Sequence, residues 1–539
     1  MGLYLNSKIP YTDYRETVQE PYFVDKTLLI QELVPSLGMK NRYFCITRPR
    51  RFGKSTMANM VGAFFGNAVD SSDLFHNLAI GKDKDSLTHL NQHNVIFIDF
   101  SRMPENCDTY HAYISRISDG LKEDLIREYP KLPLNTSKAV WDNLQIIFEE
   151  TEDRFIFVLD EWDAIFHESF IRDTDKEMYL KFMRNLLKDQ IYVELAYMTG
   201  VLPIAKYSSG SELNMFLEYD MVTKKKFSEY FGFLDREVDS LFDIYTHRSE
   251  TDATAITRDG LRLWYDGYYT ATGKRLYNPR SIVCALTDNE LSNYWTSSGP
   301  YDEIFYYIRH NIEAIRDDLA LMIAGEKIPI ILQGYAATET ELRTKNQIYS
   351  AMVVYGLLTY QNGAVFIPNK ELMNQYNELL LTNDNLGYVH RLALESERML
   401  TATLSGDTET MAEILQFVHN TESPILSYNN EAELSAVVNL IYLAARDRYR
   451  VEREDKAGKG FVDFIFYPEH KDKDSIILEL KVNGTPEDAI QQIKDKDYSL
   501  RFKGKLGEKP KYTGRILFVG ISYDKQTKEH SCAVEILRS

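Results

Sequence analysis

The chain has 539 residues, which is too many for one hydrophobic core and predicts about three or four domains. Hydrophobic residues make up 44% and charged residues 26%, a balance that excludes an intrinsically disordered chain. With 62 Lys and Arg against 80 Asp and Glu, the formal net charge is −18, which argues against a protein that passively coats nucleic acid. An enzyme whose site needs carboxylates is compatible with that charge. Contact with nucleic acid then requires a local basic patch, a metal-filled site or a partner.

The sequence also bears on where the protein acts. No long uncharged apolar run occurs, so we expect no transmembrane helix and no membrane partner. The first residues turn polar and acidic too early for a secretory signal, and Asn6 stands where a myristoylation signal requires Ser or Thr. The cysteines are widely spaced without a CxxC pair, which argues against disulfides or zinc and predicts a reducing cytoplasm. They are Cys45, Cys107, Cys284 and Cys532.

Short apolar runs alternate with helical stretches between about residues 41 and 205. Continuous apolar runs of this kind indicate strands buried on both faces, and the helices between them predict βαβ units and a parallel sheet. A loop containing glycine and a helix at about 55–66 follow the first run. We therefore predict an α/β domain over residues 1–225. The expected strands lie at 43–47, 94–100, 154–160 and 194–200.

The middle of the chain, residues 226–390, is predicted to be mainly helical and is rich in aromatic residues. Within it, a helix at 346–358 precedes Asn362-Gly363, which lies between two β-like runs and is a strong hairpin signal. A helix followed by a small hairpin fits a winged-helix module, and a simple hairpin between helices fits equally well. Residues 391–430 are predicted to be a helical spacer.

From residue 431 to the end at 539, the pattern predicts a small α/β domain. A helix is expected to run to about residue 450, and a second helix is expected near 486–502. Three strands are expected between and after them, near 460–467, 475–482 and 515–522.

The segment TRPRRFGKST, residues 47–56, carries the strongest local signal. Gly53, Lys54 and Ser55 match the second half of a P-loop, GxxxxGK[ST], between a strand and a helix. Glycine lets the backbone amides turn toward phosphate, Lys54 is expected to neutralise the β- and γ-phosphates, and Ser55 to ligate Mg²⁺. Arg48 stands where the first glycine is expected, so an ordinary loop at a helix start is the alternative. Arg51 and Thr56 complete the expected nucleotide-binding set from this loop.

A second feature supports nucleotide binding. The apolar run 155–159 ends in Asp160-Glu161, the form of a Walker B strand. Asp160 is expected to hold the magnesium shell, and Glu161 to orient or deprotonate the attacking water. Thr199, at the end of the run 194–200, is a candidate sensor of the γ-phosphate, although a strand-end threonine is an equally good interpretation. The two motifs occur in the right order on the right elements, which favours a P-loop NTPase sheet.

Further motifs accompany these two. They are YFVDKT (22–27), ITRPRRFGKST (46–56), FVLDEWD (157–163), MTGVLPI (198–204), WYDGYY (264–269), LYNPRSIV (276–283) and NYW (293–295). Over nearly its whole length the chain thereby resembles the AAA-ATPase-like family of bacterial proteins often joined to a PD-(D/E)XK nuclease domain. The resemblance implies a P-loop ATPase fold that uses ATP with magnesium. In this family an Arg at the first P-loop glycine is usual, and the family supplies no settled substrate.

The segment GFVDFIFYPEHKDKDSIILELKV, residues 460–482, contains a second constellation. Side chains alternate along a strand, so Glu479 and Lys481 share one face. An antiparallel hairpin brings Asp463 opposite them, which gives the D…ExK pattern of the PD-(D/E)XK nucleases. Asp463 and Glu479 are expected to bind Mg²⁺ or Mn²⁺, and Lys481 to position water or stabilise charge on phosphate. A salt-bridge cluster on a half-exposed sheet is the alternative.

Three further residues extend this site. Glu433, on the helix before the strands, is a candidate additional metal ligand. Gln492 and Lys496 lie four apart on the helix expected near 486–502 and so share one side of it, as candidates for contact with nucleic acid. A solvated helix face is the alternative for all three.

The preferred interpretation is an ATP-dependent or ATP-regulated nuclease that cuts DNA or RNA with magnesium. A homo-oligomer is expected by analogy with AAA-type rings. The second hypothesis is a nucleotide-switched interaction protein whose nuclease-like domain is inactive or only binds nucleic acid. The third is a pure ATPase that acts on a protein partner, in which case the acidic cluster would be spread out and salt-bridged.

Overall fold

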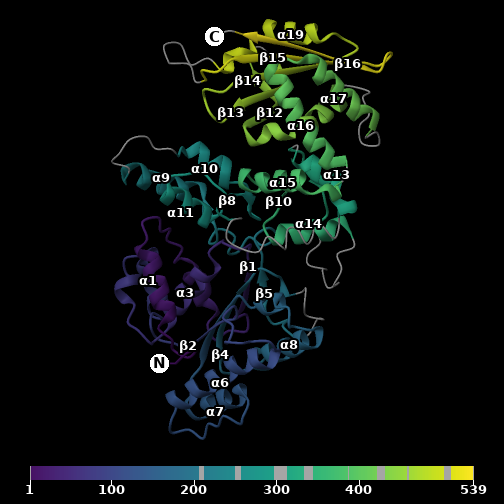
Figure 1. Ribbon diagram of the computed structural model, residues 1–539. Helices are drawn as coiled ribbons and strands as arrows, with labels where there is room; N and C mark the ends of the chain where they lie inside the picture. The colour runs from purple at the N-terminus through teal and green to yellow at the C-terminus, as the bar shows by residue number, and fades with distance from the viewer. Residues whose placement is uncertain are drawn as a thin grey trace. The chain divides into compact units, whose positions relative to one another are not determined.

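The computed structural model of the chain divides into two compact units, described here one at a time. Unit 1 comprises Met1–Tyr307 and Pro329–Glu371, and unit 2 comprises Ile308–Ile328 and Leu372–Ser539. Figure 1 labels their helices and strands. The structure describes residues 2–204, 212–248, 256–295, 312–323, 325–332, 344–386, 388–421, 431–457, 460–502 and 512–537. The four-domain division expected from the sequence remains a prediction.

Unit 1 contains a five-stranded parallel sheet in the order β2-β3-β4-β1-β5. The strand order places β1 beside β4 at the centre, although β2 and β3 lie between them in sequence, as βαβ crossovers require. The predicted parallel sheet is confirmed, and each expected strand is present within a residue or two of its expected ends. The strands are β1 (Tyr43–Thr47), β2 (Asn94–Asp99), β3 (Phe155–Asp160), β4 (Val193–Gly200) and β5 (Leu217–Tyr219).

Both faces of this sheet are buried. Along β3, Ile156 and Val158 belong to one hydrophobic cluster, while Phe157 and Leu159 belong to the other. The first cluster includes residues of α1 and α3, and the second includes residues of α6, α7 and α8. Burial on both sides explains why the strand sequences are continuously apolar. The helices are α1 (Ile9–Gln19), α2 (Leu29–Leu33), α3 (Lys54–Phe65), α4 (Ser72–Phe75), α5 (Lys84–Leu87), α6 (Tyr110–Glu128), α7 (Val140–Thr151) and α8 (Asp173–Leu187).

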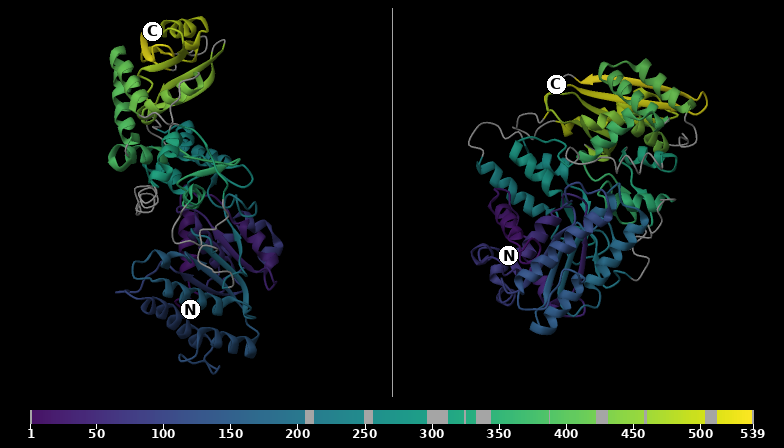
Figure 2. Two further views of the ribbon diagram at one scale, coloured as in Figure 1. Left: turned by 90° about the vertical axis from the view of Figure 1, so that its right-hand side faces the viewer. Right: turned by 60° about the horizontal axis from the view of Figure 1, so that its bottom comes forward.

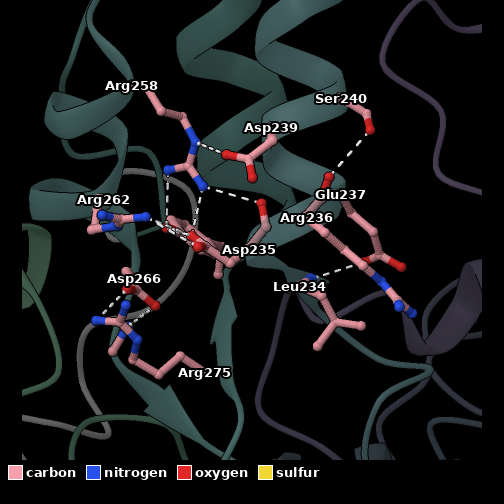
Figure 3. Close-up of polar contacts among 12 residues, drawn as sticks. Leu234, Asp235, Arg236, Glu237, Asp239, Ser240, Arg258, Arg262, Asp266 and Arg275 are labelled. Atoms are coloured by element: carbon pink, nitrogen blue, oxygen red, sulfur yellow. Dashed lines mark hydrogen bonds and ion pairs between the residues drawn. The ribbon is translucent and has the colours of Figure 1, made fainter.

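The remainder of unit 1 is mainly helical, as predicted, with two small groups of strands. An ion-pair network joins α9 to α10: Arg258 Nη2 lies 2.6 Å from Asp235 Oδ1, and Arg262 Nη2 lies 3.0 Å from Asp235 Oδ2 (Figure 3). Arg275 pairs with Asp266 at 3.0 Å, beside the small sheet β6-β8-β7. The elements are β6 (Phe233–Leu234), α9 (Asp235–Arg248), α10 (Arg258–Tyr265), β7 (Tyr268–Tyr269), β8 (Arg275–Tyr277) and α11 (Pro279–Asp288).

The expected helix and hairpin are also present in unit 1. Helix α14 (Lys345–Val354) precedes β10 (Thr359–Gln361) and β11 (Ala364–Phe366), which pair antiparallel. Asn362 and Gly363 both have positive φ, 51° and 85°, as a two-residue hairpin turn requires. The backbone amide of Ile330 donates to Gly363 O at 2.9 Å, just after the short strand β9 (Ile328–Pro329). A winged-helix identity for this module remains a prediction.

Unit 2 is built on a five-stranded mixed sheet in the order β12-β13-β14-β15-β16. Strands β14 and β15 are parallel, and the other neighbours are antiparallel. Helix α17 packs against β16, and Figure 2 shows α16 and α17 beside the sheet. The strands are β12 (Tyr449–Ala457), β13 (Gly460–Pro468), β14 (Ser475–Val482), β15 (Ile516–Asp524) and β16 (Glu529–Leu537). The helices are α13 (Ile312–Ile323), α15 (Lys370–Thr382, from Leu372 onward), α16 (Tyr388–Ser405), α17 (Thr408–Thr421), α18 (Glu431–Ile441) and α19 (Pro486–Asp495).

Two features of unit 2 differ from expectation. The helix expected to reach about residue 450 ends at Ile441, and the strand β12 starts at Tyr449. Strand β16 was not expected at all. Both are edge strands with one neighbour each, so polar side chains replace the apolar pattern that marks a central strand. Within the described ranges, every helix is too short or too polar to cross a lipid bilayer.

Candidate functional sites

The loop between β1 and α3 has the backbone of a phosphate-binding turn. Gly53 is the N-cap of α3 and has φ 85°, in the left-handed region that favours glycine. Arg51, two residues earlier, also has a positive φ of 69°. Helix α3 begins at Lys54, so its first amides are directed at the loop without intrahelical acceptors. Helix N-termini of this kind favour anions.

Arg48 has a structural role that the sequence did not reveal. Its guanidinium is 1% exposed and donates to the carbonyl oxygens of Thr47 at 2.7 Å, Tyr219 at 2.8 Å and Phe227 at 2.8 Å. The same guanidinium lies 4.8 Å from the centre of the Phe231 ring. The residue at the first P-loop glycine position therefore joins the end of β1 to β5 and to the segment after it. The sequence sign of this structural role was a long cationic side chain at a position where a P-loop has glycine.

A chain of polar contacts joins Ser55 of the loop to the ends of β3 and β4. Ser55 forms a side-chain hydrogen bond with Asp160, and Thr199 Oγ1 donates to Asp160 Oδ1. Lys54 Nζ donates to the carbonyl oxygens of Arg48 and Pro49, each at 3.1 Å. The structure thus brings together the residues that the P-loop and Walker B motifs predicted.

The acidic residues of this cluster are buried, which affects their protonation. Burial raises the pKa of Asp160 to about 6, against the hydrogen bonds from Thr199 and Ser55. Burial also raises the pKa of Glu161, while the nearby Lys54 lowers it. Lys54 is buried too, and burial lowers its pKa against the three acids Glu161, Asp163 and Asp160. A cation placed beside these carboxylates would favour their ionised forms.

Asp163 and Trp162, which follow the Walker B pair, fix the loop after β4. Asp163 Oδ2 accepts from the backbone amides of Val201 at 3.0 Å and Leu202 at 2.6 Å. Trp162 is fully buried, and a Cβ added at Gly200 would lie 2.5 Å from its Cδ1 atom. Gly200 is therefore required by close approach. Asp163, the second aspartate of the DEWD motif, was the one sign in the sequence of its contact with the loop after β4.

A pocket of about 910 Å³ surrounds this loop within unit 1. Its walls include the segment 50–57, Glu161 and Asp163, and also Arg280 and Trp295 from the helical part of the unit. Arg280 and Arg50 both lower the pKa of Arg51, so three guanidiniums lie near one another at this pocket. Its size fits a nucleoside triphosphate, and its lining combines these basic side chains with acidic ones such as Glu161 and Asp163.

The WYDGYY motif contacts the P-loop directly. The ring of Tyr268 lies edge-on to Phe52, with centroids 5.0 Å apart. The Tyr268 hydroxyl donates to Gly356 O at 3.1 Å, and a Cβ added at Gly356 would lie 2.7 Å from the Pro49 side chain. These contacts explain how a motif more than 200 residues away in sequence accompanies this P-loop.

In unit 2, Asp463 and Glu479 lie together where β13 and β14 diverge. The ladder between these strands ends at the pair Phe464 and Leu478, and Asp463 and Glu479 are the next residue on each strand. The amide of Asp463 donates to Glu479 Oε2 at 3.2 Å, and the amide of Leu480 donates to Asp463 Oδ2 at 2.8 Å. Glu479 is 2% exposed. Side chains thus take over backbone hydrogen bonds at this point.

The expected neighbours of these acids also reach the site. Lys481 Nζ donates to Gln492 Oε1 at 2.8 Å, and Gln492 Nε2 donates to Glu479 Oε1. Helix α19, which carries Gln492, packs closely on β15, because a Cβ at Gly520 would lie 2.0 Å from Pro486 O. Burial and the Asp463 charge raise the pKa of Glu479 to about 8, and Lys481 and Lys496 lower it.

The donor set at this site fits a divalent cation. The two carboxylates, of Asp463 and Glu479, are hard oxygen ligands of the kind that Mg²⁺ and Mn²⁺ prefer. The carboxylates are close enough that one raises the pKa of the other, and a cation would relieve that repulsion. Among the described side chains, no third His, Cys, Asp or Glu joins them. Glu433 belongs to α18, and its side chain lies outside the described part of the structure.

Comparison with known families agrees with both sites. A family model described as "Predicted AAA-ATPase" matches residues 9–209. A second model, described as "PD-(D/E)XK nuclease superfamily", matches residues 429–529. The chain thus carries a match to a predicted AAA-ATPase-like domain in its first part and a match to a PD-(D/E)XK nuclease domain at its C-terminal end. The first match contains the loop 48–56 and β3, and the second contains β13, β14 and α19.

The similar proteins found are all distant in sequence. A protein of Azotobacter chroococcum mcd 1, described as "Uncharacterized protein in vnfD 5'region", is 24% identical over 287 residues, or 52% of this chain. That match covers 51% of the relative, about half its length. The Walker-type ATPase PABY2304 of Pyrococcus abyssi has 12% identity and a TM-score of 0.34, over 65% of this chain and 94% of the other. The ORC2 protein of Aeropyrum pernix has 12% identity and a TM-score of 0.29, over 70% and 96%.

Proposed function

We propose that this protein binds and hydrolyses ATP in unit 1 and cleaves phosphodiester bonds of DNA or RNA in unit 2, both with a divalent cation. The observation that carries the nuclease assignment is the meeting of Asp463 and Glu479 beside Lys481. The nucleotide assignment rests on the contacts that join Ser55, Asp160 and Thr199. The proposal therefore places each activity in one unit.

For ATP, the proposed roles follow from the positions of the side chains. Lys54, which contacts the loop carbonyls, would exchange these contacts for β- and γ-phosphate oxygens. Ser55 and Asp160 would hold Mg²⁺, which supplies charge neutralisation between the phosphates. Glu161 would accept a proton from the attacking water, and Thr199 would report the γ-phosphate through its bond to Asp160. Gly53, Thr56 and Arg51 complete the binding loop, as the family resemblance implies.

For the phosphodiester, Asp463 and Glu479 would hold Mg²⁺ or Mn²⁺, and the bound cation would supply Lewis-acid activation of the attacking water. Lys481 would stabilise negative charge that develops on the phosphate. Lys496 follows α19 and lowers the pKa of Glu479, and we propose that it contacts a phosphate of the substrate. Gln492 holds both Lys481 and Glu479 and would orient them. Glu433 remains a proposed additional ligand.

A second candidate is a nucleotide-switched interaction protein whose PD-(D/E)XK domain is inactive or only binds nucleic acid. The net charge of −18 favours it, because a strongly acidic surface opposes the non-specific phosphate contacts of most nucleases. Under either candidate we propose a homo-oligomer that acts in the cytoplasm and that can also bind a protein partner.

Cleavage of labelled single- and double-stranded DNA and RNA tests the proposal, with Mg²⁺ or Mn²⁺ and with or without ATP. We expect Lys481→Ala to abolish cleavage and to leave ATP hydrolysis intact. We expect Lys54→Ala to abolish ATP hydrolysis, and a change in its cleavage would show that ATP controls the nuclease. An exposed lysine of α8, Lys181, supplies the matched control Lys181→Ala. Intact ATP hydrolysis without cleavage of any substrate would support the interaction protein instead.

A further inference from the structure

Glu371 is a buried carboxylate at the start of α15, outside the motifs discussed so far. Its side chain is 2% exposed, and burial raises its pKa to about 7. It lies in the first turn of the helix and is the last residue of unit 1, so the chain enters unit 2 directly after it. Burial of a carboxyl group is costly unless hydrogen bonds compensate for lost water. The partners of Glu371 therefore indicate what it is there to hold.

Three donors from two segments of unit 1 bind this carboxylate. Oε1 accepts from the backbone amides of Tyr294 and Trp295, both at 2.6 Å. Oε2 accepts from the hydroxyl of Ser281 at 2.8 Å. Glu371 therefore joins the first turn of α11 to the NYW segment. Its own helix neighbour Lys370 points elsewhere, with Nζ 4.9 Å from the Trp264 ring.

Both segments held by Glu371 also face the nucleotide pocket. The Trp295 indole lines that pocket, and its Nε1 donates to Arg50 O in the P-loop at 3.1 Å. Arg280 lines the same pocket and directly precedes Ser281 in the first turn of α11. The Glu371 carboxylate thus binds Trp295, which donates to the P-loop, and Ser281, which is next to Arg280 of the pocket.

We propose that Glu371 is a positioning residue of the nucleotide pocket, which sets Trp295 against the P-loop and Arg280 toward the phosphates. This inference rests on the proposed binding of ATP to that pocket.

The affinity for ATPγS with Mg²⁺, measured by calorimetry on the full chain, tests the proposal. Glu371→Ala leaves two amides and a hydroxyl without their acceptor, and we expect Kd to rise by about tenfold. Glu371→Gln keeps an oxygen for the two amides, and we expect Kd within about threefold of wild type. Glu378, an exposed glutamate of the same helix, supplies the matched control Glu378→Ala, with Kd unchanged.

A coupling measurement separates positioning from a general loss of stability. Trp295→Phe removes the indole N–H that binds Arg50 O and retains the ring, so we expect Kd to rise by about fivefold. If Glu371 acts through Trp295, adding Trp295→Phe to Glu371→Ala should raise Kd little further. Independent, multiplying effects of the two changes would overturn the proposal.

The remaining outcomes are also decisive. If Glu371→Ala does not fold, Trp295→Phe alone decides, and a wild-type Kd there overturns the inference. If wild type binds ATPγS and folded Glu371→Ala binds it equally well, this inference fails and the proposed ATP binding stands. If wild type and Lys181→Ala both fail to bind ATPγS, the proposed function fails and the inference falls with it.

Discussion

The backbone amide of Leu480 donates to Oδ2 of Asp463 at 2.8 Å, at the point where β13 and β14 stop pairing. A side chain there occupies the place of a strand carbonyl, and the amide of Asp463 in turn donates to Glu479. The ladder thus opens over the two carboxylates without leaving its amides unsatisfied. This local exchange of backbone for side-chain hydrogen bonds lets two acids meet between two largely apolar strands.

The raised pKa of Glu479 predicts a pH-dependent stability of unit 2 without a divalent cation. Its pKa rises from 4.5 to about 8 in the folded state, so folding favours the protonated form. The stability gained from that proton is complete below about pH 4.5 and is lost as the pH rises toward about 8. Glu479→Gln does not ionise and should flatten this dependence. Added Mg²⁺ should offset the loss in wild type, because it favours the ionised carboxylate.

Hydrogen exchange of peptides from β13 and β14 measures this effect in unit 2 alone. Protection should fall with rising pH more steeply in wild type than in Glu479→Gln, after correction for the intrinsic exchange rate. Parallel curves for the two proteins would show that Glu479 does not carry the pH dependence.

Arg48→Gly restores the usual P-loop glycine, and we expect it to destabilise unit 1. The change removes the donor to three carbonyl oxygens, those of Thr47, Tyr219 and Phe227, at a cost of about 2 kcal/mol or more. Arg48→Lys keeps the positive charge but lacks the several donors of the guanidinium. Its stability should therefore lie between those of wild type and Arg48→Gly. Thermal unfolding followed by tryptophan fluorescence reports on unit 1, since Trp141, Trp162, Trp264 and Trp295 all lie there. An unchanged or higher Tm for Arg48→Gly would show that the three carbonyls do not need this donor.

Thr199→Val should slow ATP hydrolysis and leave ATP binding nearly intact. Valine has the shape of threonine but lacks the hydroxyl that donates to Asp160 Oδ1. Without that bond Asp160 is less well held, and we expect kcat to fall by about 10- to 100-fold. Steady-state phosphate release gives kcat, and ATPγS calorimetry gives the affinity. Wild-type turnover in Thr199→Val would remove Thr199 from the proposed machinery.

Gly200→Ala should destabilise unit 1 through a steric clash. An added Cβ would lie 2.5 Å from Trp162 Cδ1 and 2.6 Å from Asp163 Oδ1, both in buried side chains. Overpacking of this kind costs about 1–3 kcal/mol. Tryptophan fluorescence should show a lower Tm than wild type. An equal Tm would mean that the loop after β4 shifts without cost.

The central strands of both sheets could be predicted from sequence because they are buried on two faces. Strands β1 and β3 are buried along their whole length, and β3 ends at Asp160, which accepts from Thr199. The edge strands β12 and β16 could not be predicted, because one side of each meets solvent and their sequences are rich in charged and polar residues. An apolar pattern marks a buried strand, and the sequences of β12 and β16 lack that pattern.

The same distinction holds for the sites. Lys54, Ser55 and Asp160 belong to motifs whose spacing is local, so the sequence predicted their meeting. Arg48 and Glu371 act through carbonyls and amides of segments distant in the chain, and such partners have no side-chain signature in the sequence. Their positions became evident only from the tertiary contacts.

Single-turnover cleavage of a labelled oligonucleotide with Mn²⁺ tests the account most directly, comparing wild type with Glu479→Gln. The variant replaces one oxygen of the proposed metal-binding pair by an amide nitrogen of nearly equal size. Lys471, an exposed lysine of the β13–β14 connection, supplies the matched control Lys471→Ala. We predict cleavage by wild type and by Lys471→Ala, and a loss of about 100-fold or more in Glu479→Gln. Equal cleavage by Glu479→Gln, or none by a wild type that still hydrolyses ATP, would contradict the nuclease assignment.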